Sequence, residues 1–168
     1  MRATQPFDDA TRRRHPHPRR GVAHAIAVGI KESLRPEAQL AVGVAAALAL
    51  HHRGVPHAHR VVTAVACTFL ADKAIKRLFH RRRPPRYRGN EKYESFPSGH
   101  TASAVALTVT VSQLLARAGC LAPRVRRSAW ATSALVAESR LLLDEHWPSD
   151  VVAGALLGGA VAHAVLAS

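Results

Sequence analysis

Near the C-terminal end of the chain, the stretch SRLLLDEHWPSD from Ser139 to Asp150 places five ionisable side chains among leucines and a tryptophan. Three of them can do phosphate chemistry together. The guanidinium of Arg140 can bind phosphate oxygens through parallel hydrogen bonds, and the imidazole of His146 can attack phosphorus or move a proton. Asp150 follows His146 by four residues, so on a helix it lies on the same face and can hold the imidazole in one tautomer. The stretch therefore predicts a phosphoryl-transfer site.

Two further groups of residues supply the rest of such a site. The sequence KRLFHRRRP begins with Lys76, whose ammonium is a point charge. It also contains Arg83, a second guanidinium that can bind phosphate through parallel hydrogen bonds. The sequence PSGH opens an apolar segment. Backbone N–H groups of Ser98 and Gly99 at the start of a helix favour an anion, and His100 offers a second imidazole that can protonate a leaving oxygen.

The elements that must position these residues are helices. Apolar segments lie at residues 22–34, 36–51, 61–79, 101–116, 128–143 and 151–167. They show neither the alternation of strands nor hairpin turns. We expect an all-α bundle of about five to six helices that forms one domain over residues 21–168. Residues 1–20, rich in arginine and proline, are expected to be a disordered basic tail.

The apolar segments leave two environments open. A membrane span needs about 20 mostly apolar residues, several segments are shorter, and the mean hydropathy is −0.04, so a soluble helical bundle is one interpretation. However, four segments are apolar nearly all round, whereas soluble surface helices have a polar face. Gly154 and Gly158 form the small-xxx-small pair of closely packed membrane helices. These features favour a membrane-embedded bundle.

Alternation of helix direction predicts where the polar residues meet. If each segment crosses the bundle once, the loop at 80–99 and the loop at 143–149 lie at the same end. Lys76, Arg83, His100, Arg140 and His146 can then converge there. Asp72, one turn before Lys76, can either position its ammonium group or form an ion pair without catalytic effect. We expect Asp144 and Glu145 to face water at the helix end.

The three motifs, K-x6-RP, PSGH and SR-x5-H-x3-D, in this order resemble those of the type 2 phosphatidic acid phosphatase superfamily. The matching positions are Lys76, Arg83, Pro84, Pro97, Ser98, Gly99, His100, Ser139, Arg140, His146 and Asp150. The resemblance implies a vanadium-haloperoxidase-like helical core and hydrolysis of a lipid phosphate or diphosphate, of the polyprenyl diphosphate or phosphatidic acid class.

The resemblance also implies a role for each residue. His146 is the nucleophile that forms a phosphohistidine, and Asp150 orients it. His100 is the general acid and then activates water. The phosphoryl group is held by Lys76, Arg83, Ser98, Gly99 and Arg140. No metal and no other cofactor are expected.

The charge of the chain suggests an anionic partner. There are 24 Lys and Arg against 11 Asp and Glu, a formal net charge of +13. An alternative to the enzyme is therefore a non-catalytic protein that binds nucleic acid or an anionic membrane surface. The apolar segments and the two spaced histidines argue against it, so we expect a lipid phosphate and the membrane as partners, and no nucleic acid.

Two finer expectations concern substrate and location. The loop at 84–96 carries Arg86, Tyr87, Arg88 and Lys92, more positive charge than a phosphate monoester needs, which favours a diphosphate. The resemblance implies an integral protein of a bacterial inner membrane with its active site on the outer face. The sequence does not indicate an oligomeric state.

Overall fold

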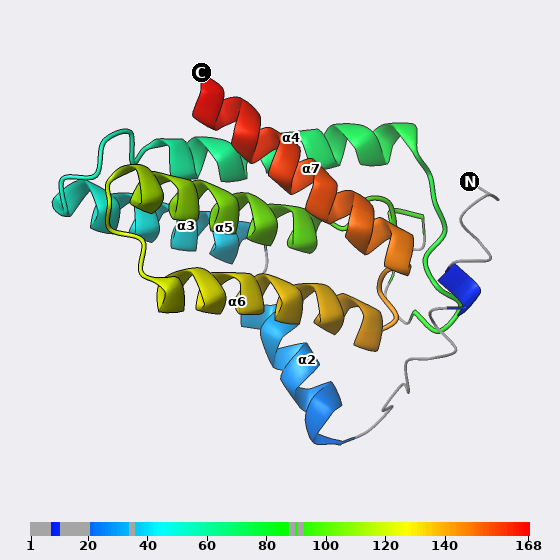
Figure 1. Cartoon of the computed structure of the whole chain (residues 1–168). Helices are drawn as coiled ribbons and strands as arrows, with labels where there is room; N and C mark the ends of the chain where they lie inside the picture. Colours follow the sequence, from blue (N-terminus) through cyan, green and yellow to red (C-terminus); the bar gives the residue numbers. More distant parts are fainter. Residues whose placement is uncertain (1–7, 11–20, 34–35, 88–89, 91–92) are drawn as a thin grey trace.

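The computed structural model describes residues 8–10, 21–33, 36–87, 90 and 93–168, and every long element in these ranges is a helix (Figure 1). The helices are α2 (Val22–Ser33), α3 (Pro36–His52), α4 (Arg60–Leu78), α5 (Gly99–Arg117), α6 (Pro123–Leu142) and α7 (Pro148–Ala167). The predicted all-α fold is confirmed. The expected disorder of residues 1–20 concerns mostly residues outside the described ranges; residues 8–10 form a helical turn.

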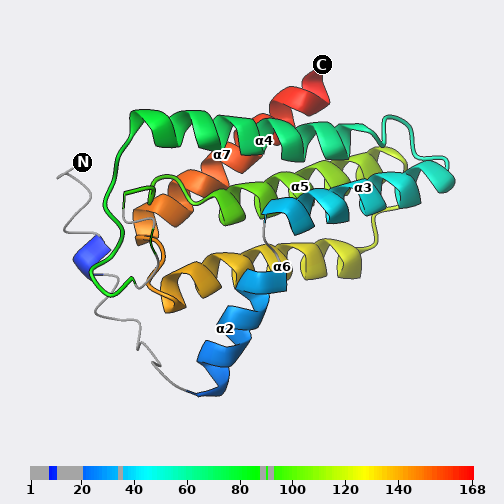
Figure 2. The same ribbon diagram turned by 180° about the vertical axis from the view of Figure 1, so that it is seen from behind.

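Helix α5 is the centre of the bundle and packs against α3, α4, α6 and α7, as the two opposite views show (Figures 1 and 2). Helix α2 packs against α6. The buried core between the helices is aliphatic and small, with Val61, Val105, Leu114 and Ala162 among its members. Short side chains let the helices approach closely, which fixes the relative positions of the residues at their ends.

Helices α5 and α7 make the most extensive contact among the described helices, and it includes the predicted glycine pair. A Cβ atom on Gly154 would lie 2.4 Å from the carbonyl oxygen of Ser98, and one on Gly158 would lie 2.1 Å from that of Ala102. Any side chain at these two positions would force the helices apart. The sequence prediction of close small-residue packing is confirmed, and it joins the start of α7 to the start of α5.

The helix limits follow from proline and capping chemistry. Helix α7 begins with Pro148 in its first turn, where a missing N–H costs nothing, and the Asp150 carboxylate accepts from the Trp147 amide at 2.8 Å. Helix α6 begins at Pro123, five residues before the predicted segment at 128–143, for the same reason. The arginines at 124, 126 and 127 therefore lie on the exposed first turns of a helix and not in a loop.

The described residues of the segment 79–98 and the loop between α6 and α7 lie at the same end of the bundle, as the alternation of helix direction predicts (Figure 1). The Ser98 amide donates to the Asp150 carbonyl at 3.0 Å, and the indole of Trp147 donates to the Arg82 carbonyl at 2.9 Å. These bonds tie the two loops together.

Within the described ranges one helix, α7, has both the length and the apolar composition to cross a membrane, with a mean hydropathy of 1.7 in its most apolar window. Residues 38–52 in α3 are apolar but shorter. Large apolar side chains are exposed on the outside of several helices, among them Leu48, Leu70, Leu135 and Leu156.

Candidate active site

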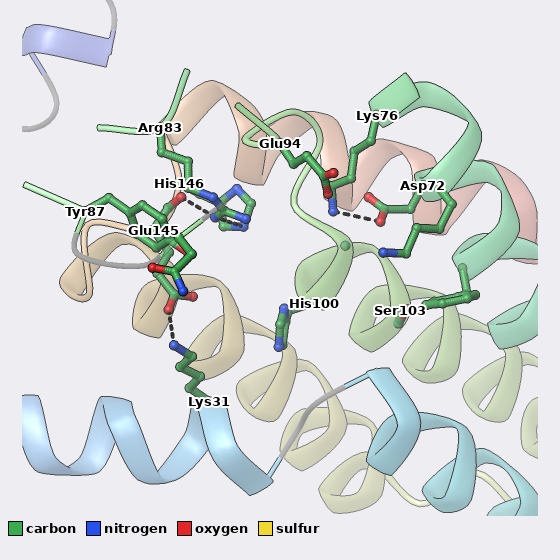
Figure 3. A pocket seen from close by; sticks show the side chains of 14 residues that line it. Lys31, Asp72, Lys76, Arg83, Tyr87, Glu94, His100, Ser103, Glu145 and His146 are labelled. Atoms are coloured by element: carbon green, nitrogen blue, oxygen red, sulfur yellow. Dashed lines mark hydrogen bonds and ion pairs between the residues drawn. The ribbon is translucent and has the colours of Figure 1, made fainter. Parts of the chain in front are cut away.

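A cavity of about 460 Å³ lies at the end of the bundle where the two loops meet (Figure 3). It is lined by five of the predicted site residues: Lys76, Arg83, Gly99, His100 and His146. They come from the end of α4, the segment 79–98, the start of α5 and the loop before α7. Of the five residues expected to converge, Lys76, Arg83, His100 and His146 line this cavity, and Arg140 does not.

His146 is buried, and a backbone carbonyl fixes its tautomer. Its Nδ1 lies 2.7 Å from the carbonyl oxygen of Ser95, which can only accept, so Nδ1 carries the proton. Nε2 then keeps its lone pair and lies 3.4 Å from an N–H of Arg83. Burial lowers the pKa of His146 below its usual value, which Asp150 partly opposes. A neutral imidazole with a free Nε2 is the form that can act as a nucleophile.

Asp150 supports His146 less directly than predicted. Its Oδ2 lies 3.7 Å from Nδ1 of His146, beyond hydrogen-bond distance. The carboxylate instead accepts from the hydroxyl of Ser95, from the Trp147 amide at 2.8 Å and from Arg81 at 2.6 Å. Asp150 thus holds Ser95, and the Ser95 carbonyl holds the imidazole.

His100 and Lys76 lie on the other side of the cavity from His146 (Figure 3). The Nε2 atom of His100 is buried and has no hydrogen-bond partner among the described residues, so it can exchange a proton with a ligand. The Lys76 ammonium is 2.8 Å from Asp72, a contact that both expected roles of Asp72 share. A Cβ atom on Gly99 would lie 2.7 Å from the same carboxylate, so glycine allows this approach.

Two predicted phosphate ligands lie behind the cavity wall. Arg140 is fully buried; it donates to the hydroxyl of Ser139 through Nε and Nη2 and to Oε2 of Glu145 through Nη1, at 3.0 Å. Ser98 is also fully buried, and its hydroxyl lies 3.0 Å from that of Thr101. With the Ser98 amide bonded to the Asp150 carbonyl, neither residue lines the cavity.

The prediction that Asp144 and Glu145 face water is wrong, because they are 8% and 7% exposed. Asp144 has a φ of 53°, which turns the chain back over the end of α6. The Glu145 carboxylate is thereby placed against Arg140, and it also contacts Lys31 of α2 at 2.6 Å. The spacing of five between Arg140 and Glu145 is not a helical pair, so no periodicity could have revealed this contact.

Sequence reasoning also missed Ser95, Arg81 and Lys31. Ser95 and Arg81 lie in a segment without regular structure, where spacing does not predict direction. Lys31 could have been found, since a lysine inside an apolar segment needs an acidic partner. Of the loop residues expected at the head group, Tyr87 lines the cavity and its ring lies 4.7 Å from the Arg83 guanidinium. Arg86 is exposed, and Arg88 and Lys92 lie outside the described residues.

Comparison with curated proteins gives two lipid A 1-phosphatases. That of Rhizobium etli is 32% identical over 108 residues, 58% of this chain and 44% of the relative. That of Rhizobium johnstonii is 35% identical over 72 residues, 43% of this chain and 27% of the relative. The chain thus matches less than half the length of these relatives.

Two solved structures share the fold. A transmembrane PAP2-type phosphatidylglycerolphosphate phosphatase from Bacillus subtilis superposes with a TM-score of 0.83 at 22% identity, covering 99% of this chain and 86% of the other. Aquifex aeolicus LpxE superposes with a TM-score of 0.59 at 17% identity, covering 90% of both chains. These likenesses concern the fold.

The sequence profile of the PAP2 superfamily matches residues 57–168. This range is most of the chain and contains all three motifs and every predicted site residue. The chain belongs to the PAP2 superfamily.

Proposed function

We propose that the protein is a membrane phosphatase that hydrolyses a lipid phosphate or diphosphate through a phosphohistidine at His146. The observation that carries the proposal is the state of the His146 ring. Nδ1 is held by the Ser95 carbonyl, and Nε2 keeps its lone pair beside Arg83 in a cavity that His100 and Lys76 also line. A nucleophile, a proton donor and cations thus surround one space.

The reaction follows from these positions. Nε2 of His146 attacks phosphorus, the bond from phosphorus to the lipid oxygen breaks, and protonated His100 gives that oxygen its proton. A phosphate dianion nearby favours the protonated form of His100. Water then attacks the phosphohistidine, His100 takes a proton from that water, the bond from phosphorus to Nε2 of His146 breaks, and inorganic phosphate leaves. Lys76 and Arg83 stabilise the charge on the equatorial oxygens in both steps.

The membrane and its lipid are proposed from several independent features. Helix α7 is apolar enough to span a bilayer, the fold is that of a transmembrane phosphatase, and both curated relatives act on the phosphate of a lipid. We place the protein in a bacterial inner membrane. Exposed arginines lie at both ends of the bundle, at 124–127 and at 77–86, so the positive-charge rule favours neither orientation; we place the site on the outer face because the family resemblance implies it.

A diphosphate substrate stays our finer prediction. Besides Lys76 and Arg83, the cavity is lined by Lys73, which supplies charge that a single phosphate does not require. Apolar walls distinguish lipid tails weakly, because each methylene changes binding by at most a few kcal/mol. Selection therefore rests on the head group.

The test uses full-length protein purified in detergent. We would compare kcat/KM for phosphate release from polyprenyl diphosphate, polyprenyl monophosphate, phosphatidic acid, phosphatidylglycerol phosphate and lipid A. His146→Asn, which is similar in size, is the control for contaminating phosphatase. Release from at least one lipid, lost in the variant, is expected. A protein that leaves the membrane pellet in high salt and releases no phosphate would instead match the non-catalytic, charge-driven binder.

A further inference from the structure

Glu145 accepts hydrogen bonds from three cations around the cavity. Its Oε2 lies 3.0 Å from Nη1 of Arg140, its Oε1 lies 2.6 Å from the ammonium of Lys31, and its backbone carbonyl lies 2.7 Å from Nη1 of Arg83. The residue lines the cavity next to His146 (Figure 3). The contact with Arg140 joins two buried charges and is a strong, charge-assisted bond, whereas the Lys31 side chain is 39% exposed.

The donors that hold Glu145 are those that a phosphoryl group needs. Under the proposed function Arg83 stabilises the phosphoryl oxygens, and the family resemblance makes Arg140 a further phosphoryl ligand. Arg140 is fully buried behind Glu145, which lines the cavity, so its Nη1 is open to a ligand only when the carboxylate is displaced. A guanidinium N–H presents the same geometry to a carboxylate oxygen and to a phosphate oxygen. Because Nε and Nη2 of Arg140 are bonded to Ser139, Nη1 is the nitrogen that a ligand would share with Glu145.

We infer that Glu145 is an internal competitor for the phosphoryl group. Substrate binds by displacing the carboxylate from Arg140, and Lys31, carried by α2, retains it. When phosphate leaves, the carboxylate returns to Arg140 and eases release of the product. This inference rests on the proposed function and adds a specificity-determining residue to it.

The competition selects substrates by charge. A terminal phosphate or a diphosphate carries about two negative charges or more near pH 7. It can therefore displace the Glu145 carboxylate, which carries a single negative charge. A phosphodiester carries only one and gains little from the exchange. Glu145 therefore selects lipids with a terminal phosphate or diphosphate against phosphodiester lipids, which surround the protein in far greater number.

Lys31 acts through Glu145 in this account and not as a phosphate ligand. A double-mutant comparison separates the two roles. Lys31→Gln should weaken phosphate binding in the wild type, because Glu145 is then held by Arg140 more firmly. In a Glu145→Gln background it should have no further effect, whereas a direct ligand would show the same loss in both backgrounds.

The experiment measures binding of orthovanadate and inorganic phosphate to the full chain in detergent by calorimetry, with KM for an aryl phosphate and an aryl phosphodiester. Glu145→Gln should lower the Kd of vanadate and of phosphate about tenfold or more. It should also reduce the difference in KM between the aryl phosphate and the aryl phosphodiester. Asp144→Asn is the matched control, because it removes the same charge one residue away while asparagine keeps the positive φ of the turn; we expect a much smaller change in vanadate and phosphate binding there.

Unchanged or weaker binding in Glu145→Gln would overturn the inference, since Glu145 would then only orient Arg140. Glu145→Asp, which keeps the charge but is one methylene shorter and cannot keep both contacts, should give a smaller gain and serves if the glutamine variant is unstable. Wild-type protein that neither binds vanadate nor releases phosphate would contradict the proposed function itself. Active wild type with no gain in either variant would contradict this inference alone.

Discussion

At the scale of residues, the placement of one proton decides what His146 can do. The Ser95 carbonyl accepts a hydrogen bond from the Nδ1–H group of His146, and Asp150 acts on the ring by holding Ser95. A carboxylate bonded directly to Nδ1 would favour a charged imidazole. The neutral Ser95 carbonyl stabilises the charged imidazole less than a carboxylate would, and burial keeps the ring neutral. The same residue is therefore both a ready nucleophile and a buried group that resists protonation.

Because His146 resists protonation in the folded protein, the stability of the protein should depend on pH. The pKa of His146 is lowered in the folded protein, so below about pH 6.5 the unfolded chain binds the proton more readily. Stability is then lost as pH falls through the window between the ordinary and the lowered pKa. We expect the fall in Tm between pH 7 and pH 5 to be smaller in His146→Gln by a few °C.

The control for this prediction is His163→Gln, which removes an exposed histidine of α7. Thermal unfolding of the three proteins in detergent, at matched pH values, gives the comparison. If the histidine at 146 and the one at 163 changed the pH dependence of Tm equally, burial of His146 would not be the cause.

His100 has a separable role as the proton donor. His100→Ala should slow hydrolysis of a lipid alkyl phosphate by about 10²-fold or more, because an alkoxide leaves only with a proton. An aryl phosphate, whose leaving oxygen needs little protonation, should be slowed much less. Steady-state kcat for the two substrates measures the difference, and an equal loss on both would mean that His100 does not act as the acid.

At the scale of elements, the contact between α5 and α7 positions the site. It joins Ser98, next to His100, to Asp150 and the loop that carries His146. The small-residue pair in α7 makes this possible, since there is no room for a Cβ atom at either glycine. Separation of these helices would move both histidines at once.

Gly158→Ala tests this contact with one methyl group. The new Cβ would lie 2.1 Å from the Ala102 carbonyl oxygen, and relief of such a clash costs about 1–3 kcal/mol. We expect Tm to fall by several °C and kcat to fall with it. The matched control is Gly159→Ala, where nothing lies within 4 Å of the new Cβ, so better helix propensity should leave Tm unchanged or raise it. Equal behaviour of the two variants would show that the contact is not tight.

At the scale of the whole molecule, the number of long helices, most of their limits and the end at which the motifs meet could be predicted from the sequence, whereas α6 begins at Pro123, before its predicted segment. Apolar segments with proline or glycine at their ends locate helices, and alternation of direction places Lys76 and His146 together. The contacts of irregular segments could not be predicted. The carbonyl of Ser95, the turn at Asp144 and the pairing of Glu145 with Lys31 depend on how loops fold over the helix ends, for which spacing carries no periodic information.

The cationic side chains around the cavity also predict that the protein releases phosphate without a metal ion. Lys76 and Arg83 line the cavity and can neutralise phosphoryl oxygens, the task that Mg²⁺ performs in many phosphoryl transfers. Phosphate release should therefore persist after treatment with EDTA, and orthovanadate should inhibit it. Activity that is lost in EDTA and restored by Mg²⁺ would contradict this assignment of charge stabilisation.

Trapping the phosphorylated enzyme tests the central claim most directly. Protein mixed with lipid substrate should be quenched in alkali, which preserves phosphohistidine, digested, and analysed by mass spectrometry. We predict one phosphoryl group on the peptide that contains His146, present in wild type and in greater amount in His100→Ala with an aryl phosphate, and absent in His146→Asn. Active enzyme that carries its phosphate on another residue, or turnover retained in His146→Asn, would contradict the account.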